Sequence, residues 1–529
     1  MTNDTFERFA ARSLHHAALD CTLDWSRAGF DASEVAGLGP ELSRALDAMA
    51  ELEGGSIANP DEGRRVGHYW LRAPELAPDG ALRAAIEETG VRVRSLAASI
   101  QDGTLASPTG ARFRHALVVG IGGSALGPQL VIDALGVASG TDGALDVRFA
   151  DNTDPDGFER HLVRLAGELG ATLVVVISKS GGTKETRNGM LEVAAAYARA
   201  GLDFGGHAVA ITQAGSELDR HARENGFRAT LPMWDWVGGR TSVTSAVGLF
   251  PAALAGVDVA ALLDGAAAMD RLTRVRDPLA NPAALLAAAW HLLGDGRGRR
   301  AMVMLPYKDR LELSSRYLQQ LVMESLGKRE DRAGNVVSQG LTVYGNKGST
   351  DQHAYVQQLL DGPDDFFVTF VEILRDRRGE DLEVEAGITS GDYLSAFLQG
   401  TRKALATRGK RSLTLTFGVL DARTLGAYLA LFERAVGLYA ELIGINAYHQ
   451  PAVESGKRAA AAVLALQVRA VACLHAASQD GLTAGELAMS LGTDDADALF
   501  VALRHLAANG RVTMTSDGDP LRTRFAARR

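Results

Sequence analysis

Cysteine is almost absent from this chain of 529 residues, and its scarcity excludes two kinds of protein. Cys21 and Cys473 are the only cysteines, and two thiols so far apart indicate neither a disulfide framework nor a zinc cluster. The HExxH and EF-hand patterns of metal sites are missing as well. The sequence therefore predicts reduced thiols in a cytosolic protein, with no metal.

Long apolar runs and an excess of positive charge are also lacking. No run reaches the roughly 20 apolar residues of a membrane span, and the first residues, MTNDTFERFAARSLHH, lack the apolar core of a signal peptide. The net charge of −9 argues against general affinity for nucleic acid, which depends on a basic surface. With 46% hydrophobic and 22% charged residues, we expect a soluble, cytoplasmic protein whose partners are small molecules.

The length favours two large domains and a smaller piece rather than a single core. Residues 1–110 read as mostly helical, with Phe6, Phe9, Ala10 and Leu14 spaced for one helix face. Apolar strands then alternate with helical segments, which is typical of parallel, doubly wound α/β sheets. The expected strands are 117–120, 145–150, 173–177 and 208–212, followed by 300–307, 366–371 and 412–416. The predicted domains are 1–110, 111–275, 276–468 and 469–529.

The stretch VVVISKSGGTKET, residues 174–186, is the strongest functional signal. A β-branched strand runs into a loop of hydroxyls, a lysine and two glycines, and a helix then begins near Thr183. The N-terminus of that helix offers free N–H groups and partial positive charge to a phosphate. Lys179 precedes the glycines, so this is not a Walker loop, and we expect a phosphate held without metal. An ordinary strand–turn–helix connection is the alternative.

A second glycine-rich turn, GIGGSALGP, follows the strand at 117–120 and carries the Ser124 hydroxyl. Gly120, Gly122 and Ala125 also fit the dinucleotide fingerprint, with Asp151 at the end of the next strand. Asp151 lies beyond the usual spacing of about 20 residues. Both loops follow parallel strands, so they can face one crevice at the carboxyl ends of the sheet.

Two further segments carry charged groups suited to catalysis. Arg240 lies beside Gly239 in WDWVGGRTS, where a guanidinium could stabilise an anion formed during reaction, or simply cap a turn. A helix predicted over 311–326 places Gln320 and Glu324 on one face. Glu324 is surrounded in sequence by apolar residues, which could raise its proton affinity and suit it to act as a general base. The alternative is a solvated glutamate near the end of a helix.

Two later segments supply groups that can transfer protons. His353 lies near the start of a helix predicted from about residue 351, where the helix dipole favours neutral imidazole. Gln450 takes the cap position of a helix with Pro451 in its first turn, and Lys457 follows two turns later. The last sixty residues, with a capping box at Thr483 and a turn at 509–510, resemble a winged-helix outline. Their expected role is packing or assembly.

Six motifs together resemble the successive signatures of the glucose-6-phosphate isomerase family, over roughly residues 117–460. They are GIGGSALGP, SKSGGTKET, WDWVGGRTS, LQQLVMESLGK, GSTDQHAYVQQL and NAYHQPAVESGK. The resemblance implies two sugar-isomerase (SIS) domains of αβα-sandwich type, preceded by helices. It also implies reversible conversion of glucose 6-phosphate to fructose 6-phosphate in glycolysis and gluconeogenesis, without cofactor, by a homodimer. The last sixty residues are outside the usual family core.

By this resemblance, a catalytic set and a binding set can be named. Glu324 moves the proton between C1 and C2, Arg240 stabilises the cis-enediolate, and His353 and Lys457 open the sugar ring. The counterpart of His353 comes from the neighbouring subunit, which implies shared active sites. The substrate-binding residues are Ser124, Ser178, Lys179, Ser180, Thr183, Glu185, Gly239, Gln320 and Gln450. Two alternatives stay open: an NAD-dependent oxidoreductase using the Gly120 turn, and a non-catalytic sugar-phosphate sensor.

Overall fold

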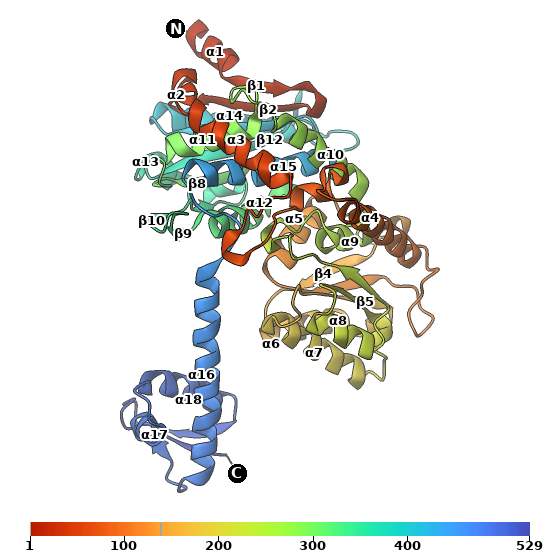
Figure 1. Cartoon of the computed structure of the whole chain (residues 1–529), viewed down its shortest axis with the longest axis vertical. Helices are drawn as coiled ribbons and strands as arrows, with labels where there is room; N and C mark the ends of the chain where they lie inside the picture. Colours follow the sequence, from red (N-terminus) through yellow and green to blue (C-terminus); the bar gives the residue numbers. More distant parts are fainter. Residues whose placement is uncertain (1, 138–139, 529) are drawn as a thin grey trace. The chain divides into compact units, whose positions relative to one another are not determined.

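The computed structural model describes residues 2–137 and 140–528, which form two compact units (Figure 1). The first unit comprises residues 1–449 and contains both large sheets. The second unit comprises residues 450–529. The finer domain boundaries at residues 110, 275 and 468 stay predictions.

The first sheet has five parallel strands in the order β4-β3-β5-β6-β7. The strands are β3 (His115–Val119), β4 (Asp146–Ala150), β5 (Thr172–Ile177), β6 (Ala208–Thr212) and β7 (Ala229–Pro232). Alternate residues of β5 enter different cores, because successive side chains of a strand point to opposite faces. Val174 and Val176 join the core on one face, and Leu173 and Val175 join the other.

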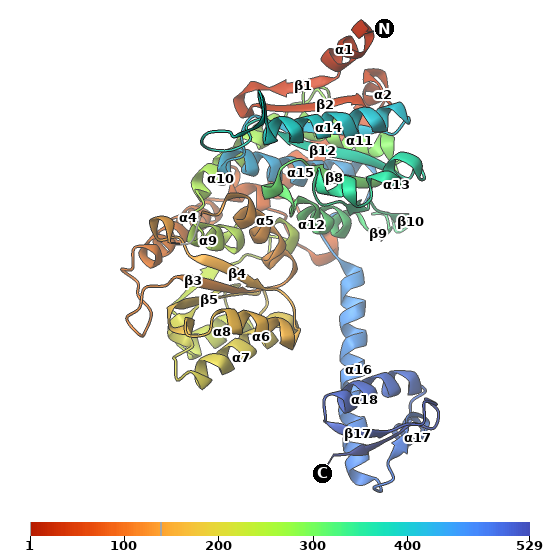
Figure 2. The ribbon, with the colours of Figure 1, turned by 180° about the vertical axis from the view of Figure 1, so that it is seen from behind.

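Helices cover both faces of this sheet, which makes the predicted αβα sandwich (Figures 1 and 2). One layer consists of α6 (Pro155–Arg164), α7 (Lys184–Arg199) and α8 (Glu217–Glu224). The other consists of α4 (Gly80–Gln101), α5 (Leu126–Leu135) and α9 (Ala246–Leu254). The four strands expected from the sequence are all present, with ends that differ by at most two residues.

The second sheet has the order β1-β2-β15-β12-β8-β11, and its last four strands are parallel. These are β8 (Ala301–Pro306), β11 (Val343–Tyr344), β12 (Phe366–Ile373) and β15 (Ser412–Phe417). One face packs on α3 (Gly39–Glu53), α10 (Val259–Leu272), α11 (Pro282–Leu293) and α15 (Ala422–Leu442), and the other on α13 (Val356–Asp361) and α14 (Ser390–Thr407). The two-sheet α/β fold is therefore confirmed.

The N-terminal segment differs from the predicted run of helices. Helix α1 (Thr2–Ala11) ends before Leu14, and β1 (Ser13–His16) and β2 (Cys21–Arg27) form an antiparallel hairpin. Strand β2 then pairs antiparallel with β15 and extends the second sheet. The helix predicted around Phe6 is present but short. The segment after it forms strands instead, because β2 pairs with a strand almost 400 residues away. Helix α2 (Ala32–Gly37) and α3 come next.

Short elements complete the first unit. They include α12 (Ser314–Leu318), the hairpin of β9 (Lys328–Glu330) and β10 (Val336–Gln339), and the hairpin of β13 (Glu383–Glu385) and β14 (Ile388–Thr389). Several single turns of 3₁₀ helix connect the larger elements, among them η5 (Gly122–Ser124) and η9 (Gly239–Thr241).

The second unit is a small helical domain with a three-stranded sheet. It contains α16 (Pro451–Ala476), α17 (Ala484–Leu491), α18 (Ala496–Ala508), β16 (Leu482–Thr483), β17 (Val512–Thr515) and β18 (Arg524–Ala527). The capping box of Thr483 and Glu486 is formed as predicted. By length and composition alone α16 could cross a membrane, which was not predicted from the sequence. Its C-terminal half packs into this unit's core through Leu466 and Leu474.

Candidate active site

The loop 178–183 follows β5 and leads into α7, as the sequence predicts. The buried Ser178 hydroxyl accepts a hydrogen bond from the Gly181 N–H (3.1 Å) and donates one to Thr183 Oγ1 (3.4 Å). Gly181 has φ +75° and lies so close to α8 that a Cβ there would be 2.2 Å from the Leu218 nitrogen. The Thr183 side chain, at the N-cap position of α7, accepts no hydrogen bond from the first N–H groups of the helix. This geometry suits a bound anion.

Lys179 ties this loop to the segment that carries Arg240. Its ammonium donates to the carbonyl oxygens of Asp235 (2.6 Å) and Val237 (3.0 Å). Burial, assisted by the charge of Arg64, lowers the pKa of Lys179 to about 8. The lysine is therefore held in a partly buried position, where its charge interacts more strongly with a neighbouring anion than it would at the open surface.

The two glycine turns meet. A Cβ on Gly123 would lie 1.9 Å from the carbonyl oxygen of Gly239, so only glycine permits this approach of η5 to η9. The Ser242 hydroxyl joins the turns by donating to the Gly123 carbonyl (3.3 Å). Gly122, at φ +60°, lies beside the side-chain amide of Gln320. The structure thus gathers parts of three predicted motifs that are far apart in sequence.

Glu324 lies at the end of a π-helical segment, Gln319–Glu324, that continues α12. The sequence predicted a single helix over 311–326. The structure differs because the second part of this helix has the wider turns of a π-helix. π-Helical turns are rare and frequently occur at functional sites, because they displace the side chains beyond them. Gln320, like Glu324, is only partly buried.

Arg240 and Glu324 face each other. Arg240 is buried, and its Nε lies 3.7 Å from Glu324 Oε2, whose side chain is 26% exposed. A terminal nitrogen of the guanidinium also donates to the His449 carbonyl (3.4 Å). Burial lowers the pKa of Arg240, and the Glu324 charge opposes that shift. Because an arginine stays protonated even so, the pair places a fixed cation beside a carboxylate that solvent can reach.

Lys328 belongs to this cluster and was not singled out from the sequence. Its buried ammonium donates to the carbonyl oxygens of Glu324 (2.8 Å) and Ser325 (2.7 Å). Burial and the nearby charge of Arg240 lower its pKa to about 7. A lysine four residues after a glutamate reads as a surface ion pair in sequence, and its burial follows only from the fold.

His353 lies at the end of a 3₁₀ turn, Thr350–His353, before α13 and not inside its first turn as predicted. Its side chain is exposed and makes no hydrogen bond or ion pair with any described residue. Its expected role stays a prediction.

The remaining predicted residues fall at element ends. Ser124 ends η5, Ser180 is exposed on the phosphate loop, and Glu185 is partly buried in the first turn of α7. Gln450 takes the cap position of α16, as expected, and Lys457 follows within that helix. Both belong to the second compact unit, and their assignment to the site stays a prediction.

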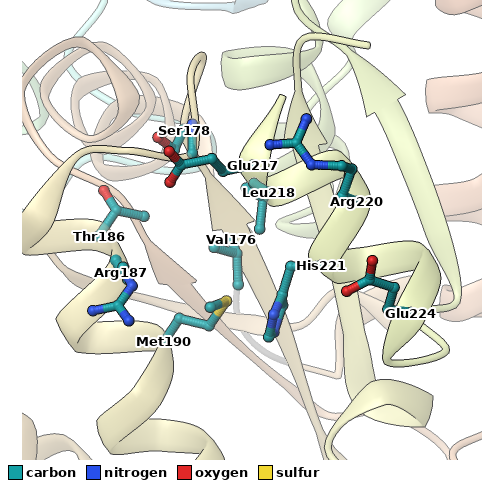
Figure 3. A pocket seen from close by; sticks show the side chains of 11 residues that line it. Val176, Ser178, Thr186, Arg187, Met190, Glu217, Leu218, Arg220, His221 and Glu224 are labelled. Carbon is teal, nitrogen blue, oxygen red and sulfur yellow. Dashed lines mark hydrogen bonds between the residues drawn. The ribbon is translucent and has the colours of Figure 1, made fainter. Parts of the chain in front are cut away.

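A pocket of ≈ 300 Å³ lies behind the phosphate loop, between α7 and α8 (Figure 3). Ser178 and Glu217 lie at one end, and Arg187, His221 and Glu224 lie farther along the helices. Arg240 and Glu324 do not line it, so it is distinct from the paired charges described above. Within residues 2–137 and 140–528, no group of three or more His, Cys, Asp or Glu side chains could hold a metal ion.

Comparisons with known proteins give matches over most of the chain. The family model described as phosphoglucose isomerase matches residues 41–407. The glucose-6-phosphate isomerase of Geobacter sulfurreducens is 57% identical, with 99% of each chain covered, and that of Synechococcus elongatus is 54% identical over 97% of this chain and 96% of its own.

A solved structure, a glucose-6-phosphate isomerase from Chlamydia trachomatis, superposes with a TM-score of 0.78 at 27% identity, covering 87% of this chain and 90% of that one. The NAD-dependent and sensor alternatives find no support in these relatives. The sequence similarity spans nearly the entire chain, including both glycine turns and the phosphate loop. The chain belongs to the phosphoglucose isomerase family.

Proposed function

We infer that this chain is a glucose-6-phosphate isomerase that interconverts glucose 6-phosphate and fructose 6-phosphate, a step of glycolysis and gluconeogenesis. The observation that carries the inference is the Arg240–Glu324 pair, 3.7 Å apart, in a chain 57% identical to a named isomerase. An aldose–ketose shift needs a base at the C1–C2 edge and a cation for the anion that forms. This pair supplies both.

The substrate phosphate binds at the loop 178–183 and the start of α7. Ser178, Ser180 and Thr183 offer hydroxyls, and Lys179 offers a charge, with Ser124 on the adjoining turn. Phosphate held there gives binding energy remote from the reacting carbons and fixes their position. Glu185, Gly239, Gln320 and Gln450 are the proposed contacts to the sugar.

The reaction then needs ring opening, followed by transfer of a proton from C2 to C1. Opening the hemiacetal ring takes an acid and a base, the roles we give to His353 and Lys457. Glu324 next removes the C2 proton and returns it to C1, which typically contributes about 10²–10⁴-fold by general base catalysis. Arg240 stabilises the cis-enediolate oxygen as negative charge appears on it. No cofactor enters this scheme.

The test is isomerase activity of the purified protein, without added metal or nucleotide, compared with Glu324→Gln. We expect turnover by the parent and a fall in kcat of at least about 10²-fold in the variant. Glu330→Gln, a matched change at an exposed glutamate nearby, should keep full activity. Undiminished turnover by Glu324→Gln would remove Glu324 from the mechanism, and an inactive parent would refute the proposed function.

We also propose a cytoplasmic homodimer with shared active sites, in which His353 serves the partner's Glu324. The support is the exposure of His353 in the single chain. Co-expression of Glu324→Gln with His353→Ala tests it, because a heterodimer would then hold one intact site. Random pairing should restore about a quarter of the parent's activity. If the mixture stays as inactive as either variant alone, each site takes its histidine from its own chain.

A further inference from the structure

A cavity of ≈ 340 Å³ opens at the carboxyl end of the second parallel sheet. Its walls are the segments that leave β8, β12 and β15, together with the end of α5. Ligands of open α/β sheets bind outside the carboxyl ends of the strands. In the first sheet that edge carries the phosphate loop, so this cavity is the equivalent position in the second sheet. Nothing in the proposed isomerase mechanism uses it.

The charged side chains that line the cavity are all basic. Among the residues that the structure describes, no acidic side chain lines it, whereas the chain as a whole has a net charge of −9. The five cations come from the segments after β8 and β12: Lys308, Arg310, Arg375, Arg377 and Arg378. Lys308 is partly buried, whereas the four arginines are exposed. Such a concentration of one sign of charge attracts anions to the cavity.

The surrounding groups compensate only part of this charge. Arg377 pairs with Asp381 (2.9 Å), but no carboxylate in the described ranges lies within ion-pair distance of the other four cations. Arg310 donates to the Ala134 carbonyl at the end of α5 (2.9 Å), which leaves the rest of its guanidinium for a ligand.

Lys308 is held by main-chain oxygens. Its ammonium donates to the carbonyl of Arg375 (3.1 Å) and to that of Asp376. The charges of Asp376 and Asp309 favour its protonation, but burial outweighs them and lowers its pKa. An anion in the cavity would favour the charged form.

The opposite wall is apolar. It is formed by the last residues of α5 and by the segment after β15: Ala134, Leu135, Gly136, Val137, Val419 and Leu420. Val137 and Val419 are more than a third exposed, so a ligand could cover them. A site with cations on one side and aliphatic groups on the other fits a molecule that is anionic at one end and apolar at the other.

We propose that this cavity binds a small organic polyphosphate, with its phosphates on the arginines and its ring or base on the aliphatic wall. Guanidinium groups recognise phosphate oxygens through paired hydrogen bonds, which explains why arginine predominates. A single sugar phosphate carries too little charge for the four cations that have no carboxylate partner in the described ranges. The volume lies at the lower end of the range of small-ligand pockets, about 300–1,000 Å³.

The test uses ATP without divalent metal as the probe, in isothermal titration calorimetry at near-physiological salt, with glucose 6-phosphate present at saturation. Sugar phosphate then occupies the proposed catalytic loop. We expect one ATP per chain, and binding at least about 10-fold weaker in Arg375→Gln/Arg378→Gln. The matched control, Arg164→Gln/Arg199→Gln, removes two exposed arginines elsewhere and should bind ATP like the parent. Thermal unfolding verifies that each variant is folded.

Several outcomes would overturn the proposal. Displacement of ATP by glucose 6-phosphate would place it at the phosphate loop, and equal weakening in both double variants would mean nonspecific charge attraction. Absence of binding would remove the site, and inorganic tripolyphosphate binding as tightly as ATP would refute an organic ligand. Isomerase activity is a separate readout, which Arg375→Gln/Arg378→Gln should leave unchanged. The polyphosphate site can therefore be refuted without refuting the isomerase function, and the reverse also holds.

Discussion

Replacing Arg240 with glutamine removes one buried cation from the candidate active site while keeping a hydrogen-bonding side chain of similar reach. The guanidinium lies 3.7 Å from the Glu324 carboxylate, and we expect the enediolate oxygen to form at a similar distance. The phosphate loop is a separate element, tied to this segment through Lys179. The substitution should therefore affect the chemical step and leave phosphate binding nearly intact.

The magnitude depends on the distance and the burial of the pair. Two unit charges 3.7 Å apart interact with about 4.5 kcal/mol at an effective dielectric constant of about 20. Because 26% of the Glu324 side chain is exposed, solvent screens part of this, and we take about 3 kcal/mol for the enediolate. That energy corresponds to a fall in kcat of about 10²-fold, in the range measured when one oxyanion-stabilising donor is removed.

The assay is steady-state conversion of fructose 6-phosphate, with kcat and KM determined separately for the parent, Arg240→Gln and Arg240→Lys. We expect a large loss in kcat with little change in KM, and partial recovery with lysine, which keeps the charge but not the planar fork. Arg44→Gln, at an exposed arginine, is the control. A raised KM with unchanged kcat would refute the reasoning, since it would make Arg240 a ground-state binding group.

Three further changes test other parts of the site and the fold. Burial lowers the pKa of Lys179 to about 8, so its ammonium is present below that pH and is lost as pH rises through it. Lys179→Met should raise KM at pH 7, where the parent still carries the ammonium charge. Near about pH 9.5 the parent has lost most of that charge, so the difference in KM between the variant and the parent should be smaller. A difference in KM that does not change with pH would contradict the lowered pKa. Gly123→Ala places a methyl 1.9 Å from the Gly239 oxygen and should lower kcat/KM by about 10²-fold, whereas Gly400→Ala, in open space, should have no effect. Buried Arg434 pairs with the carboxylates of Glu53 and Asp270. Arg434→Met should lower the free energy of unfolding by about 3–5 kcal/mol in urea titration. A loss below about 1 kcal/mol would show that the other partners of these carboxylates, Arg274 and Arg72, compensate for the missing charge.

The sequence by itself determined the strands of the first sheet, the main strands of the second sheet and several helix starts. The β-branched run 174–177 alternates its side chains between two cores, so it forms a buried strand in any context that supplies helices on both sides. The capping box at Thr483 and Pro451 after Gln450 set helix starts by local hydrogen bonding and a restricted φ. Such features depend on neighbours within a few residues, which is why they could be predicted.

Only the tertiary structure decided which side chains meet and where burial falls. Arg240 and Glu324 are 84 residues apart in sequence, and they come together because η9 packs against the π-helical segment. Lys328 looks like a surface residue until the fold buries it, and β2 becomes a strand because β15 offers it an unpaired edge. Long-range packing and desolvation set these outcomes, and neither is encoded in local spacing.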